Sequence, residues 1–69
     1  MYLTTSLKEM KMTVRDRDEL LIRVLRLLRW EGDMGKRYGL QQLGESLLCE
    51  YRDLNYSIVK KNIDRDYPT

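Results

Sequence analysis

The run TVRDRDELLIRVLRLLRW, residues 13–30, constrains the fold more than any other part of the sequence. Its apolar residues recur at helical spacing, and projected at 100° per residue they cover an arc of roughly 160°. These residues are Leu20, Leu21, Val24, Leu25, Leu27 and Leu28. A surface helix needs a narrower stripe, so this segment must be covered from more than one side.

The ends of this run carry helix signals. Thr13, followed three positions later by Asp16, resembles a capping box with aspartate in place of glutamate. Acidic side chains crowd the first turns and arginines the last turns, as the helix dipole favours. The sequence therefore predicts a helix over residues 13–31.

The segment EGDMGKRYG, residues 31–39, holds three of the four glycines among charged residues. Such clusters interrupt regular structure, so we predict a glycine-rich loop over residues 31–39. A second helix is predicted over residues 38–54, where one apolar seam follows helical spacing. The seam consists of Leu40, Leu43, Leu47, Tyr51 and Leu54, flanked by Leu48 and Gly44.

Two residues of the second helix carry separate expectations. Gly44 adjoins the apolar seam, where the missing side chain would let another backbone come close. Cys49 falls on the polar side, which predicts an exposed thiol.

The stretch NYSIVKKNIDR, residues 55–65, is predicted to form a short third helix. Asn55 can cap it, after which Tyr56, Val59 and Ile63 share one face. Residues 66–69 form a tail. Residues 1–12 form an arm for which a short strand, an ordered coil and a further helical turn remain open. The fold class is therefore mainly α: a single small domain over 1–69, built as a helical hairpin with a short third helix.

Several kinds of chemistry are excluded by composition. The chain has no histidine and one cysteine, so an internal disulfide, histidine-dependent zinc sites and Ser/His or Cys/His pairs are ruled out. Acidic residues stand mostly beside arginine or lysine, which indicates solvated ion pairs rather than catalytic carboxylates. We expect no enzyme activity, no cofactor and no metal site.

Size points to a partner. A chain of 69 residues buries only about 60% of the surface that its unfolded form exposes, so the stability of its core alone is marginal. Small domains usually gain stability from disulfides, a metal or a second subunit. Oligomerisation or docking on a partner is the remaining source of stability. The N-terminal stretch lacks the apolar region of a signal peptide, and no stretch approaches the roughly 18 apolar residues of a membrane span. We expect a cytoplasmic protein that does not enter a membrane.

The first candidate site is an arginine face on the first helix. Arg23, Arg26 and Arg29 stand in one row, and Ile22 and Trp30 fall among them. Tryptophan and arginine are enriched in interface hot spots. Trp30 either contributes to such an interface or folds back over the end of the core. An arginine row suits carboxylates and phosphates equally well.

The second candidate site is the third helix. Its polar start and its lysine pair resemble the recognition helix of helix-turn-helix domains. The resemblance implies base contacts from Asn55, Tyr56 and Ser57 and phosphate contacts from Lys60 and Lys61. The spacing differs from the common motif, because Gly44 is followed by Leu48 rather than by a turn glycine and the predicted second helix continues to residue 54.

These features predict a non-catalytic regulatory or adaptor protein, of the inhibitor or chaperone type, that acts through a helical surface. Its partner would be another protein or a second copy of the chain in a homo-oligomer. The alternative is a helix-turn-helix-like regulator that binds nucleic acid through residues 55–63.

Overall fold

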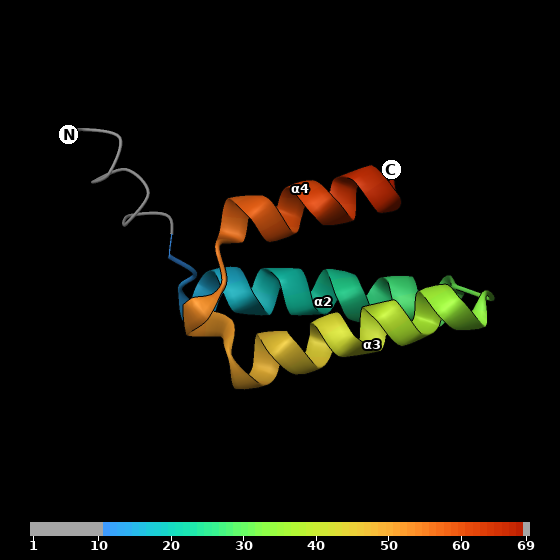
Figure 1. Cartoon of the computed structure of the whole chain (residues 1–69), viewed down its shortest axis with the longest axis horizontal. Helices are drawn as coiled ribbons and strands as arrows, with labels where there is room; N and C mark the ends of the chain where they lie inside the picture. Colours follow the sequence, from blue (N-terminus) through green and yellow to red (C-terminus); the bar gives the residue numbers. More distant parts are fainter. Residues whose placement is uncertain (1–10, 69) are drawn as a thin grey trace.

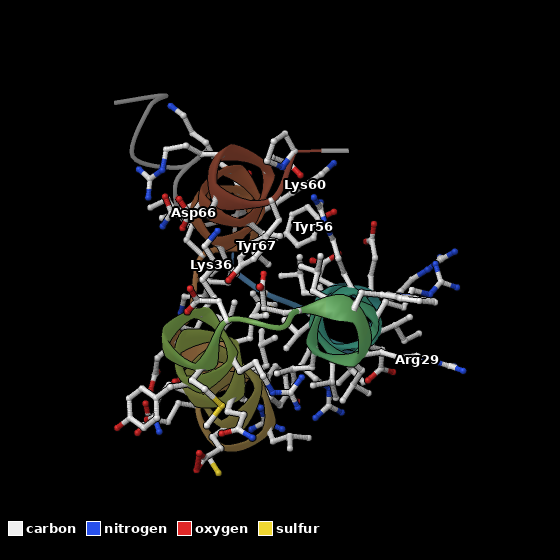
Figure 2. All side chains as sticks on the ribbon, turned by 90° about the vertical axis from the view of Figure 1, so that its right-hand side faces the viewer. Arg29, Lys36, Tyr56, Lys60, Asp66 and Tyr67 are labelled. Atoms are coloured by element: carbon white, nitrogen blue, oxygen red, sulfur yellow. The ribbon has the colours of Figure 1, made fainter. Side chains whose placement is uncertain are left out.

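The computed structural model describes residues 11–68, which form three α-helices. The helices are α2 (Val14–Trp30), α3 (Met34–Cys49) and α4 (Tyr56–Asp66), with one 3₁₀ turn, η1 (Tyr51–Asp53), before α4. α2 and α3 form an antiparallel hairpin, and α4 runs lengthwise beside them, so that the three helices form the corners of a triangle when viewed end-on (Figure 1 and Figure 2). The mainly α fold, with a hairpin and a short third helix, is confirmed.

The capping box of α2 is present as predicted. The backbone N–H of Asp16 donates to Thr13 Oγ1 at 3.1 Å, and the backbone N–H of Thr13 donates to Asp16 Oδ2 at 3.3 Å. At the other end, the backbone N–H of Glu31 donates to the carbonyl of Leu27. Local signals in the sequence therefore define both ends of this helix.

The predicted loop over residues 31–39 is wrong. Only residues 31–33 connect the hairpin, and Gly35 and Gly39 lie inside α3. Asp33 caps α3, since its Oδ1 accepts a hydrogen bond from the backbone N–H of Lys36 at 3.1 Å. The Arg37 side chain donates to the carbonyls of Leu28 and Glu31, which ties the start of α3 to the end of α2.

The predicted end of the second helix is also wrong, because α3 stops at Cys49 instead of residue 54. Leu54 is extended, with φ −95° and ψ 145°, and its carbonyl accepts a hydrogen bond from Met12 N at 3.2 Å. Lys11 and Asn55 form an isolated antiparallel bridge beside it. The chain thus leaves α-helical geometry after Cys49, and its extended residues 54–55 pair with the arm.

The short third helix is confirmed, with its end one residue later than predicted. Asn55 caps α4 by accepting a hydrogen bond from the backbone N–H of Ile58 at 3.1 Å. Of the predicted arm, residues 1–10 lie outside the described residues. Within the described range, Lys11 and Met12 contribute the bridge and a buried side chain.

All three helices and Met12 contribute to one small core. The buried side chains are Met12, Leu20, Val24, Leu40, Leu47, Val59 and Ile63. Part of the apolar arc of α2 stays uncovered, and Leu25 is 57% exposed. None of the described helices has the length and apolar character needed to cross a membrane.

Candidate partner-binding site

A groove of about 270 Å³ lies between α2 and α4. Its lining brings together members of both sequence-predicted sites: Ile22, Arg23 and Arg26 from α2, and Tyr56 and Lys60 from α4. Glu19 and Leu20 of α2, which the sequence did not assign to a site, complete the lining. Tyr56 and Lys60 project from the same side of α4, towards the flank of α2 (Figure 2). The two candidate sites therefore share one surface.

Tyr56 links the two sides of this groove. Its hydroxyl donates a hydrogen bond to Glu19 Oε2 at 3.1 Å. Burial between the helices raises the pKa of Tyr56, and the bond to the Glu19 carboxylate raises it further. The ammonium of Lys60 lies 5.9 Å from the centroid of the Tyr56 ring, within the range of a cation–π contact.

Arg23 is engaged inside the molecule. Its guanidinium forms a salt bridge with Asp64 of α4, and its Nη2 donates to the carbonyl of Tyr67 at 3.3 Å. These contacts hold the last turns of α4 against α2. Arg23 therefore stabilises the fold, and its guanidinium is already engaged when a partner binds.

Arg26 and Lys60, unlike Arg23, are not paired with a carboxylate of the described residues. Both are exposed, and neither forms an ion pair with any residue in 11–68. Ile22 and Trp30 lie one helical turn before and after Arg26, and neither carries a charge that could pair with it. The groove thus carries two cations whose charge is not neutralised by a direct contact.

From its midpoint to its last residue, α2 exposes large apolar side chains beside the arginines. Trp30 is 82% exposed and Ile22 is 52% exposed. Trp30 therefore does not fold back over the core, and the Arg29 guanidinium carbon lies 5.8 Å from the centroid of its ring. Arg29 itself extends into solvent, away from α3 and α4 (Figure 2).

The residues assigned to DNA contact divide into two groups. Asn55 is the N-cap of α4, and Tyr56 is partly buried and bonded to Glu19. Ser57, Lys60 and Lys61 are exposed. Two of the five side chains are therefore already occupied by contacts within the fold.

A second groove, also of about 270 Å³, lies between α2 and α3 and is more apolar than the first. It is lined by Leu21, Val24, Leu25, Leu28, Gln41, Gly44, Glu45 and Leu48. A Cβ atom added at Gly44 would lie 3.6 Å from Val24 Cγ1, in ordinary contact. The expected close approach of another backbone at Gly44 is thus not found among residues 11–68.

The remaining candidates add no further site. Cys49 is exposed, as predicted. In the described part of the chain, no cluster of histidine, cysteine, aspartate or glutamate could hold a metal ion. The chain has no significant match to a protein-family model, a curated protein or a solved structure.

Proposed function

We propose that this chain is a non-catalytic regulatory or adaptor protein, of the inhibitor or chaperone type, that binds another protein through α2. The binding surface consists of Ile22, Arg26, Arg29 and Trp30, and it continues into the groove between α2 and α4. We place this protein in the cytoplasm, where its single exposed cysteine stays reduced.

This proposal rests on the exposure of Trp30. A tryptophan that is 82% exposed contributes little to a core, and its removal from water would stabilise a complex. Arginine and tryptophan together are enriched among the residues that dominate binding energy. Ile22 extends the apolar surface by two helical turns, and Arg26 lies between them.

We further propose that the chain forms a homodimer through the groove between α2 and α3. Leu25 and Leu48 are 57% and 55% exposed on its two sides. Domains of this size commonly gain stability from a second subunit, because their own core is small. Covering these leucines with the same surface of a second copy would complete the apolar arc of α2.

Nucleic-acid binding through α4 is the second candidate, and the exposure of Ser57, Lys60 and Lys61 favours it. Two features weigh against a helix-turn-helix. Residues 50–55 separate α3 from α4, which exceeds the usual turn, and the three helices run lengthwise beside one another (Figure 1). The last two helices of that motif cross steeply.

A salt series separates the two candidates. Each phosphate contact steepens the fall of affinity with salt, so removing one lysine should reduce the slope by about 1. For a DNA-binding α4, the double substitution Lys60→Ala with Lys61→Ala should reduce the slope on a DNA column by about 2. For the protein-binding proposal, parent and variant should elute together at low salt.

A photo-crosslinking scan tests the protein-binding proposal directly. An aromatic photoreactive residue placed at Ile22 or Trp30, which keeps a large apolar side chain at either position, should yield the same crosslinked protein in expressing cells. The same residue placed at Lys36, on another side of the molecule, should not yield it. Equal products from all three positions would show nonspecific contact and would refute the proposal.

A further inference from the structure

We infer that the groove between α2 and α4 recognises an acidic segment of a partner protein, in which an apolar side chain is flanked by carboxylates. This inference rests on the proposed function and adds the chemistry of the partner. It follows from how charge is distributed among the residues that line the groove.

The walls of the groove are apolar where the helices meet. Leu20 is buried beneath it, while Ile22 and the ring of Tyr56 remain accessible from outside. An apolar side chain of the partner would cover these surfaces and remove them from water. A chain of carboxylates without such a residue would leave them exposed.

Within the described part of the chain, internal contacts neutralise only one charge pair near the groove, since Arg23 is paired with Asp64. Glu19 accepts the hydrogen bond of Tyr56 but keeps its negative charge, and Arg26 and Lys60 form no ion pair in residues 11–68. Two cations against one carboxylate leave the lining with a net positive charge, whose complement is a carboxylate or another anion.

The charges also give the groove a direction along α2. Glu19 lies near the start of the groove, while Arg26 lies almost two turns further along the helix. A bound segment would place one carboxylate near Arg26, away from Glu19, and another near Lys60, whose ammonium lies beside the Tyr56 ring. Because Arg26 can form two parallel hydrogen bonds to one carboxylate, this end would fix the orientation of the segment.

The apolar walls favour a protein segment over nucleic acid. Phosphates would neutralise Arg26 and Lys60, but the sugar–phosphate backbone brings no aliphatic side chain to cover Ile22. Protein segments commonly combine both groups. Nucleic acid is therefore an outcome of the test and not the inferred occupant.

A titration followed by NMR tests the inference with three synthetic peptides and one DNA duplex. The first peptide combines glutamate with leucine, the second replaces every glutamate by glutamine, and the third replaces every leucine by serine. The first should shift the backbone amides of Ile22, Arg26, Tyr56 and Lys60. We expect each altered peptide to bind at least about tenfold more weakly, because each lacks one of the two required features.

Peptide binding by variants of the chain is the second part of the test. Arg26→Glu with Lys60→Glu should abolish binding of the first peptide, and Arg26→Gln with Lys60→Gln should weaken it without reversing charge. Lys36→Glu is the matched control, because Lys36 lies on the other side of α4 from Lys60 (Figure 2). Glutamate is also favoured in the first turn of α3, so this control should stay folded.

Three results would overturn the inference. The glutamine peptide could bind as well as the first, Lys36→Glu could weaken binding as much as the groove variants, or the DNA duplex could shift the same amides more strongly than any peptide. If the peptides fail while the crosslink from Ile22 persists, this inference fails and the proposed function stands. If both fail, both are wrong.

Discussion

Tyr56 connects the binding groove to the stability of the fold, because its hydroxyl holds α4 to Glu19 of α2. Burial and this bond raise the pKa of Tyr56, and burial also raises the pKa of Tyr67 at the end of α4. A tyrosine whose pKa is higher in the folded state binds its proton more tightly there. Its contribution to stability is present below the unfolded pKa of about 10 and is lost as the pH rises through the folded pKa.

Urea unfolding between pH 8 and pH 11 should therefore show a decline in stability above about pH 10 that Tyr56→Phe makes shallower. At pH 8 the same substitution should cost about 0.5–1.5 kcal/mol, the usual contribution of one hydrogen bond. Tyr38→Phe is the control, since Tyr38 is exposed on α3. Equal declines for the parent and Tyr56→Phe would contradict this role of the hydroxyl.

Arg23 and Arg26 have the same side chain one turn apart and different surroundings. Arg23 bonds to Asp64 and to the Tyr67 carbonyl, whereas Arg26 has no ion pair within residues 11–68. We expect Arg23→Ala to lower the free energy of unfolding by about 1 kcal/mol, and Arg26→Ala to change it by less than about 0.5 kcal/mol. Chemical denaturation measures both, and the reverse order would show that the Arg23 contacts do not stabilise the fold.

α3 is the helix whose composition least favours helix formation. Gly35, Gly39 and Gly44 all lie within it, and no glycine in residues 11–68 has a positive φ. None of the three is therefore required by its backbone conformation. The helix forms because Asp33 caps it, Arg37 ties it to α2, and Leu40 and Leu47 are buried.

Gly39→Ala should stabilise the chain by about 0.5–1 kcal/mol, because alanine loses less conformational freedom in a helix. A Cβ atom at Gly39 would meet nothing within 4 Å, so no contact opposes the change. Thermal unfolding followed by circular dichroism measures the gain. A lower melting temperature would show that the glycine serves a purpose other than helix formation.

The sequence predicts α2 and α4 well because the signals that define them are local. Thr13 and Asn55 cap their helices through residues three positions away. Both ends of α3 are mispredicted for opposite reasons. The glycines suggest a loop where the helix begins, and the extended Leu54 after its end pairs with Met12, which is far away in the chain.

The sequence likewise predicts the local part of the candidate site and misses the part that depends on contacts between helices. Helical periodicity places Ile22, Arg26 and Trp30 on one surface of α2, and their exposure agrees with that prediction. The groove itself is not predicted, because it joins residues 19–26 to residues 56–60. The engagement of Arg23 by Asp64 is missed for the same reason, since local spacing suggests Glu19 as its partner.

At the scale of the whole molecule, α2 contributes to two grooves of different character. The groove shared with α4 carries the cations Arg26 and Lys60, whereas the groove shared with α3 is largely apolar. This separation would let one surface bind a partner while the other binds a second copy.

Sedimentation equilibrium at micromolar concentration should show a dimer of the 8.3 kDa chain. Leu25→Glu should produce a folded monomer, because Leu25 is exposed and lines the groove between α2 and α3. Ile22→Glu is the matched control: Ile22 is similarly exposed on the same helix (52% against 57%) but lines the other groove, so this variant should remain dimeric. A parent chain that sediments only at 8.3 kDa would refute self-association.

The central claim is that the surface of α2 around Arg26 binds a protein. Its most direct test is the yield of the protein crosslinked from a photoreactive residue at Ile22, compared between the parent chain, Arg26→Glu and Trp30→Ala. Circular dichroism should show that both variants stay folded, since both side chains are exposed. We predict that Arg26→Glu abolishes the crosslink and that Trp30→Ala strongly reduces it. Undiminished yields in both variants would contradict the claim and show that this surface is merely solvated.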